Sequence, residues 1–145
     1  MLEMLDILLI NIIVVVCAVI IHYEFLFRLN RYIPRLHVLH RYRIVIGLLG
    51  ALIAHAVEIW VFALAYYFAI PREGLGALDG AFNGTIMDCV YYSFTVFTTL
   101  GFGDIFPAGD IRFLTGVESL TGLVLITWTA SFLFLDMQRY WGDDN

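Results

Sequence analysis

The sequence contains no lysine, and charged residues of all kinds make up only 14% of its 145 positions. Proline occurs three times and cysteine twice, and Cys17 and Cys89 match no disulfide or metal-ligand spacing. We therefore read both cysteines as small buried hydrophobic residues. The four histidines are scattered, and no nucleophile–base arrangement is present. We expect no enzymatic activity, no cofactor and no nucleic-acid partner.

The sequence is rich in apolar residues. Hydrophobic residues make up 61% of the chain, and the mean hydropathy is +0.87. In soluble proteins the apolar share is roughly half. A single domain of this length cannot bury so much apolar surface in a core of its own. The lipid bilayer is the solvent that this composition predicts.

Three apolar stretches, residues 5–27, 44–70 and 111–135, are long enough to cross the hydrocarbon core, which takes about 20 helical residues. The connector 28–43 carries five arginines and no acid, namely Arg28, Arg31, Arg35, Arg41 and Arg43. Residues 71–110 carry one arginine and five acids. Because arginine-rich loops stay cytoplasmic, we expect the connector and the C-terminus inside and the N-terminus outside.

A few polar side chains interrupt these apolar stretches. We expect Asn11 to hydrogen-bond a neighbouring helix, and His22 and Glu24 to reach the membrane interface near the end of their helix. His55 and Glu58 stand three positions apart and share a helix face. We interpret them as a structural pair that ties their helix to its neighbours, with a pH-sensitive pair as the alternative.

The segment between the second and third spans contains the most distinctive pattern. Residues 71–84 are predicted to be a solvent-exposed loop, and 85–98 a helix too short to cross the membrane. Residues 99–104 follow, with Gly101 and Gly103 flanking an aromatic residue. Glycine adopts backbone conformations closed to other residues, so such an alternation can aim successive carbonyl oxygens in one direction. A row of carbonyls can replace the hydration shell of an ion.

Residues 99–104 resemble the selectivity filter of potassium channels, usually Thr-Val-Gly-Tyr-Gly-Asp, and read Thr99-Leu100-Gly101-Phe102-Gly103-Asp104. The pair Tyr91-Tyr92 precedes them where the family carries an aromatic cuff, and Pro107 follows at the outer mouth. Residues 44–141 resemble the two-span pore module as a whole. Its parts are an outer helix 44–70, a pore helix 85–98, the filter 99–104 and an inner helix 111–135. With the helix in 1–43 and a short tail 142–145, the chain resembles small three-span potassium-channel-like proteins of bacteria.

The resemblance implies an all-α membrane protein with a re-entrant pore helix and a tetrameric pore in the plasma membrane. Its implied function is a homotetrameric potassium channel without a voltage sensor or a cytoplasmic ligand domain. Carbonyls of the filter and the Thr99 hydroxyl would hold dehydrated potassium. The implied ion-binding residues are Thr99, Leu100, Gly101 and Phe102, with Gly103 completing the loop.

The resemblance also implies supporting roles around the filter. Tyr91 and Tyr92 would brace it, and Asp104 would concentrate cations at the outer mouth. Thr95 stands where some members carry a carboxylate behind the filter, and we expect Glu118 of the inner helix to substitute for it.

The inner helix carries the candidate moving parts. Gly122 stands near the family's hinge, although a glycine there also permits close packing. Phe132, Phe134 and Leu135 are candidates for a hydrophobic gate. Two departures from the family pattern, Leu100 and Phe102, leave nonselective cation conduction as an alternative. A non-conducting accessory subunit is a second alternative.

Overall fold

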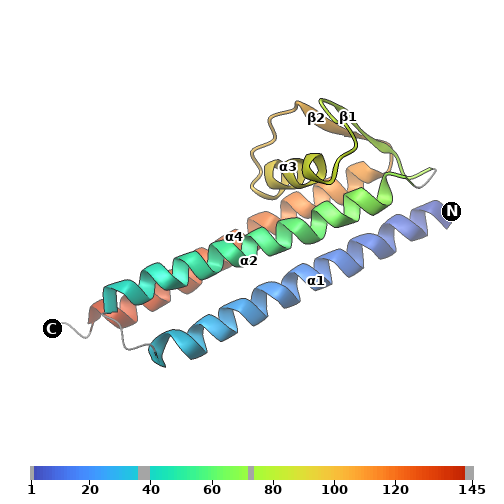
Figure 1. Cartoon of the computed structure of the whole chain (residues 1–145). Helices are drawn as coiled ribbons and strands as arrows, with labels where there is room; N and C mark the ends of the chain where they lie inside the picture. The colour runs from blue at the N-terminus through green and yellow to red at the C-terminus, as the bar shows by residue number, and fades with distance from the viewer. Residues whose placement is uncertain (1, 36–39, 72–73, 143–145) are drawn as a thin grey trace.

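Three long helices form the body of the protein in this computed structural model. The structure describes residues 2–35, 40–71 and 74–142, with side chains over 5–35, 42–71 and 74–138. The long helices are α1 (Leu2–Tyr32), α2 (His40–Ala69) and α4 (Ile111–Gly142), and they run side by side (Figure 1). All three are long and apolar enough to span a membrane. The chain is therefore built as a multi-pass membrane protein.

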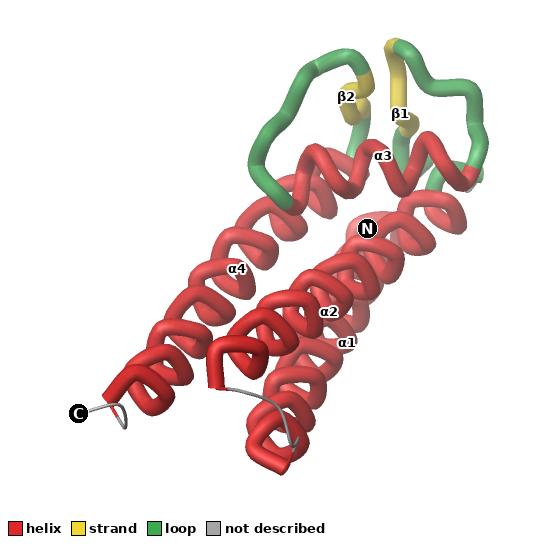
Figure 2. The backbone as a smooth tube through the Cα atoms, turned by 60° about the vertical axis from the view of Figure 1, so that its left-hand side comes forward, coloured by secondary structure: helices red, strands yellow, loops and turns green. Residues whose placement is uncertain are grey.

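One short helix, α3 (Ile86–Phe97), lies between α2 and α4 at one end of the body (Figure 2). Thr85 caps it: the Thr85 hydroxyl accepts from the Asp88 amide at 3.1 Å, and the Asp88 carboxylate accepts from the Thr85 amide at 3.1 Å. This reciprocal capping box satisfies amides that the first helical turn leaves unpaired. Hydrogen bonds from the backbone of Thr85 and Asn83 lower the pKa of the Asp88 carboxyl.

The structure is mostly helical, as expected of an all-α membrane protein, and a small antiparallel sheet is added to the helices. Strand β1 (Ala77–Gly80) lies in the segment predicted to be a loop, and it pairs with β2 (Ile105–Ala108). Gly80 has a φ of +91°, and a Cβ there would lie 2.1 Å from the Asp104 carbonyl oxygen. Four-residue strands carry too little alternation to be seen locally, and glycine is what lets these two backbones approach.

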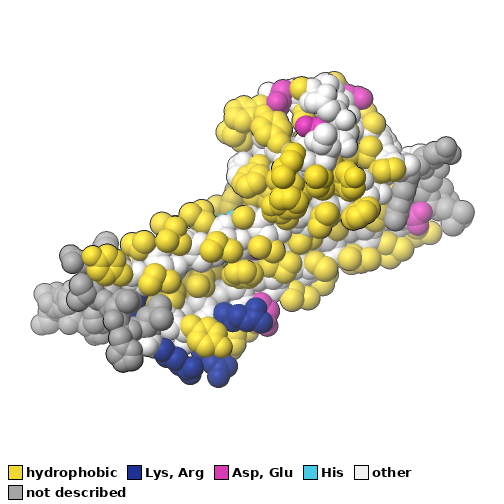
Figure 3. Space-filling model, in the orientation of Figure 1, with side chains coloured by type: hydrophobic (Ala, Val, Ile, Leu, Met, Phe, Trp, Pro, Cys, Tyr) yellow, Lys and Arg dark blue, Asp and Glu magenta, His cyan; other side chains and the backbone are white. Residues whose placement is uncertain are grey.

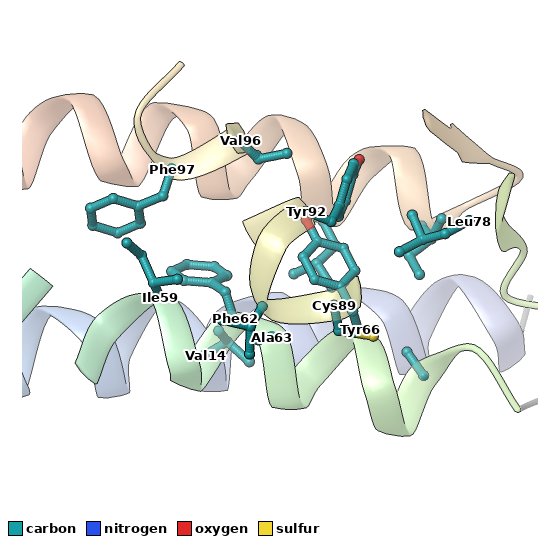
Figure 4. Packing of buried hydrophobic residues seen from close by; sticks show 14 of the residues in the cluster. Val14, Ile59, Phe62, Ala63, Tyr66, Leu78, Cys89, Tyr92, Val96 and Phe97 are labelled. Carbon is teal, nitrogen blue, oxygen red and sulfur yellow. The ribbon is translucent and has the colours of Figure 1, made fainter. Parts of the chain in front are cut away.

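The buried core is concentrated where α2, α3 and α4 meet (Figure 4). The rings of Tyr66 and Tyr92 pack edge to face with centroids 5.1 Å apart, and Phe62 packs against Phe97 at 6.3 Å. Both cysteines are free thiols; Cys89 is buried in this cluster as predicted, whereas the prediction that Cys17 is buried is wrong, because it is exposed on α1. The core thus holds α3 against the two spanning helices.

Charge is divided between the two ends of the body. Arginine side chains gather at the end opposite the sheet, and most acidic side chains lie at the sheet end (Figure 3). Glu24 lies at the arginine end, where its carboxylate pairs with Arg28 at 3.0 Å. The side chains of several charged and aromatic residues lie outside the described part of the chain, namely Arg41, Arg72, Glu73, Arg139, Tyr140 and Trp141.

Candidate ion-binding loop

The loop that follows α3 has an alternating backbone. Thr99, Gly101 and Gly103 have φ angles of +59°, +52° and +80°, while Leu100 and Phe102 between them do not take positive values. Among the described non-glycine residues, Thr99 is the one with positive φ. Threonine is β-branched, so this conformation is strained for it. An alternation of hand along five residues lets successive carbonyl groups face the same side of the chain.

The amides of the loop are turned back onto the end of α3. The Thr99 amide donates to the Val96 carbonyl at 2.9 Å, and the amides of Leu100 and Gly101 donate to the Thr95 carbonyl at 2.9 and 3.0 Å. Within the described part of the chain, no backbone amide donates to a carbonyl of residues 99–103. These carbonyl oxygens, which have no backbone donor in the described part of the chain, therefore lie in an exposed segment.

The two tyrosines of α3 have different surroundings. The Tyr91 hydroxyl donates to the Asp104 carboxylate at 2.8 Å, and this hydrogen bond raises the pKa of Tyr91. Tyr92 instead points into the core, where its hydroxyl lies 2.9 Å from the Thr115 hydroxyl. Tyr91 therefore contacts the C-terminal end of the loop directly, whereas the Tyr92 hydroxyl contacts α4.

A buried carboxylate joins three helices behind the loop. Glu118 of α4 accepts from the Tyr66 hydroxyl of α2 at 2.6 Å and from the Ser93 hydroxyl of α3. The Thr95 hydroxyl donates to the Tyr92 carbonyl at 2.8 Å and does not reach Glu118. Glu118 thus contacts α3 at Ser93. No pattern in the sequence predicts this contact for Ser93.

Gly122 lies where α4 packs closely against the end of α3. A Cβ at this position would lie 2.1 Å from the carbonyl oxygen of Phe97, the last residue of α3. This contact agrees with the prediction that a glycine at position 122 permits close packing. Its role as a hinge stays a prediction.

The three candidate gate residues do not share one face of α4. Phe134 and Leu135 line a surface groove with Thr127 and Ser131. Phe132 lines a different groove, together with residues of α1. The hydroxyls of Thr127 and Ser131 donate to carbonyls of their own helix, at 2.7 and 3.1 Å. A gate at this end would therefore be built from Phe134 and Leu135, with Phe132 turned toward α1.

Two predictions for α1 are wrong. His22 does not reach the interface: it is fully buried, and its Nδ1 lies 2.9 Å from the Glu58 carboxylate. The helix continues to Tyr32, and ten residues of helix span about 15 Å, so His22 lies well inside the span. Asn11 donates to the Ile7 carbonyl of its own helix at 2.7 Å rather than to a neighbour.

His55 and Glu58 are in contact, as their spacing predicts. The His55 Nδ1 lies 2.9 Å from the second carboxylate oxygen of Glu58, so the carboxylate meets both histidines. The contact agrees with the interpretation of His55 and Glu58 as a structural pair. A pH-sensitive role for the pair stays a prediction. One feature of the sequence could have indicated the burial of His22. It is an ionisable residue within an apolar span, and such side chains usually face protein.

Comparison with known protein families agrees with this architecture. A family model described as "Ion channel" matches residues 43–139, which include α3, the loop and almost all of α2 and α4. The chain belongs to this family of two-span, pore-loop, potassium-channel-like ion channels. No curated protein and no solved structure matches the chain. Helix α1 ends at Tyr32 and lies entirely outside the matched region.

Proposed function

We propose that the protein is a potassium-selective channel in which four copies surround one pore. The observation that carries this proposal is the alternating φ at Thr99, Gly101 and Gly103, in a loop whose amides bond back to α3. This backbone leaves a row of carbonyls for the ion. Such a row is how potassium channels replace the hydration shell.

In the proposed filter, dehydrated potassium is held by the carbonyls of four residues and by one hydroxyl. The carbonyls are those of Thr99, Leu100, Gly101 and Phe102; the hydroxyl is that of Thr99, and Gly103 completes the loop. A single loop contacts an ion from one side only, so the shell requires several copies around an axis. The exposure of Leu100 (59%) and Phe102 (65%) in one chain supports neighbours that cover them.

Helix α3 would be the re-entrant pore helix. Its 12 residues span about 18 Å, which is less than the hydrocarbon core of about 30 Å. Its C-terminal end leads into the loop, and the partial negative charge of a helix C-terminus favours a nearby cation. Asp104, held by Tyr91, would raise the cation concentration at the outer mouth.

The proposed orientation has the sheet and the N-terminus outside and the connector 28–43 and the C-terminus in the cytoplasm. The N-terminus lies at the sheet end of the body, and the C-terminus lies at the other (Figure 1). The arginine-rich end would face the cytoplasm of the plasma membrane. A cysteine introduced at Leu2 should react with an impermeant reagent added outside cells, and labelling from the cytoplasm alone would refute this orientation.

Nonselective cation conduction is the nearest alternative, and a specific residue favours it. Phe102 lacks the phenolic hydroxyl that the family usually has at this position, so the loop has one hydrogen bond fewer to hold its width. A non-conducting accessory subunit is the other alternative. In an accessory subunit, the alternating φ angles of the loop would have no role in ion conduction.

Ion flux through the purified protein tests the proposal. The protein is placed in liposomes under a potassium gradient and then under a sodium gradient, with barium as blocker. Potassium flux that barium stops, with little sodium flux, is the expected result. Equal flux of both ions would support the nonselective alternative, and no flux under any condition would support the accessory subunit.

A further inference from the structure

We propose that His22, His55 and Glu58 form a binding site for one divalent transition-metal ion of the zinc class. The cluster lies where α1, α2 and α4 meet, apart from the ion-binding loop, and it stands independently of the potassium proposal. Each residue offers one ligand atom, and these atoms lie within 4.8 Å of one another. The cluster brings α1, which lies outside the matched region, into contact with α2 and α4.

The ligand atoms are already spaced as neighbours in a coordination sphere. The His22 Nδ1 lies 2.9 Å from one oxygen of the Glu58 carboxylate, and the His55 Nδ1 lies 2.9 Å from the other. At a metal–ligand distance of about 2.1 Å, two atoms so spaced subtend an angle of about 90° at the metal. Two imidazoles and a carboxylate suit zinc and its neighbours, whereas potassium and magnesium prefer oxygen alone.

Thr129 of α4 sets the histidines in the orientation that a metal requires. Its hydroxyl oxygen lies 3.0 Å from the His55 Nε2 and 3.5 Å from the His22 Nε2. With a metal on both Nδ1 atoms, the imidazole protons would stand on Nε2, and the two lone pairs of the hydroxyl could accept from both nitrogens. An outer partner of this kind is typical of histidine ligands.

Aromatic rings hold the two imidazoles in place. The His22 ring packs against Trp128 with centroids 5.2 Å apart, and the His55 ring packs against Phe97 at 5.8 Å. Preorganised rings lower the cost of assembling a site. Through Phe97, the last residue of α3, the cluster also contacts the helix that leads into the loop.

Charge and burial favour a bound cation. The side chains of Glu58 and His22 are 0% exposed, and an isolated carboxylate at that depth of a membrane span is costly. A divalent ion would offset the carboxylate, and a fourth position would remain for water or hydroxide. The His55 side chain is 13% exposed and provides the open edge.

Cobalt binding tests the proposal without any measurement of conduction. The full chain is prepared with His37→Gln and His40→Gln, which removes the other two histidines, then stripped with a chelator and titrated with Co²⁺. We expect visible absorption bands that saturate at one Co²⁺ per chain and that added Zn²⁺ abolishes. Absence of such bands in helical, correctly folded protein would overturn the proposal and leave a hydrogen-bonded cluster.

Three variants locate the binding. Glu58→Gln should weaken Co²⁺ binding by more than about tenfold, and Thr129→Val, which keeps all three ligands, by about 10- to 100-fold. Glu24→Gln is the matched control, because it removes an exposed carboxylate two positions from His22 and should leave binding unchanged. Equal affinity in the wild type and Thr129→Val, or a loss in Glu24→Gln, would contradict the site. If Glu58→Gln does not fold, the Co²⁺ affinity of Thr129→Val still tests the site.

Discussion

Single residues determine whether the loop can present its carbonyls. Gly101 and Gly103 adopt positive φ without strain, while Thr99 does so against the preference of a β-branched residue. Three amides bonded to the end of α3 offset that strain. The loop therefore depends on backbone conformation, and side chains matter mainly where they hold its ends, as Tyr91 does at Asp104.

Gly101→Ala tests the backbone directly. A Cβ at Gly101 meets nothing within 4 Å, so the cost of the substitution is the positive φ, about 1–2 kcal/mol. We expect potassium flux in liposomes to fall by about an order of magnitude or more as the loop leaves this conformation.

Gly84→Ala is the matched control for that substitution. Gly84 has a φ of +81° and equally open surroundings, but it lies outside the loop. The control should lose similar stability and keep its flux. Equal flux in the wild type and both variants would mean that the loop does not conduct.

The sequence predicts the features of some of these residues and not of others. Both glycines of the loop could be predicted, because glycine is the residue that positive φ favours. The positive φ of Thr99 could not, since it arises from the contacts with α3 rather than from threonine itself. The burial of His22 was missed because an underestimated helix length placed it near an interface.

At the scale of elements, α3 is positioned from both ends. Its N-terminus is fixed by the capping box of Thr85 and Asp88, and its C-terminus lies against Gly122 of α4. Between them, Glu118 joins Ser93 to Tyr66. The end of α3, and with it the loop, is thus placed by contacts along the whole helix.

The capping box should make stability depend on pH. The Asp88 pKa is lowered in the folded protein, so its contribution is fully present above the ordinary aspartate value of 3.8 and is lost as pH falls through the folded value. We expect the Tm difference between wild type and Asp88→Asn to be constant near neutral pH and to shrink in acid. A difference that does not change down to the lowest pH tolerated would contradict the capping role.

Gly122→Ala separates packing from hinge motion. The new Cβ would overlap the Phe97 carbonyl, and overpacking of this kind costs about 1–3 kcal/mol. We expect a lower Tm together with altered flux, measured on the same preparation in detergent and in liposomes. Altered flux at an unchanged Tm would instead support a hinge.

Gly116→Ala on the same helix is the control for Gly122→Ala. Nothing lies within 4 Å of a Cβ at Gly116, and alanine favours helix over glycine by about 1 kcal/mol. The Tm of this variant should stay the same or rise. A fall would mean that the loss in Gly122→Ala reflects glycine replacement in general rather than the contact with Phe97.

Elements differ in how far the sequence predicts them. The long spans and α3 follow from apolar runs and their boundaries, which are local properties. The strands β1 and β2 are four residues each and pair across the whole of α3, so their formation depends on a distant partner. The inner helix continues to Gly142 rather than ending at 135, because helix ends are weakly encoded where no proline or capping glycine intervenes.

At the scale of the whole molecule, the exposed apolar surface must be covered by lipid or by other copies. Apolar side chains of the loop and of α4, such as Leu100, Phe102 and Leu120, are each more than half exposed in a single chain. The proposed tetramer places this end of each chain against its neighbours. Native mass measurement in mild detergent should give four chains, and a conducting monomer or dimer would refute the assembly.

The most direct test of the potassium filter is the reversal potential of the purified channel in a planar bilayer, with potassium on one side and sodium on the other. The measurement compares the two ions within one pore, so it does not depend on how many channels are open. The proposed filter predicts a reversal potential far from zero, in the direction set by potassium. A reversal potential near zero, with clear current, would show that Leu100 and Phe102 line a pore that does not select potassium.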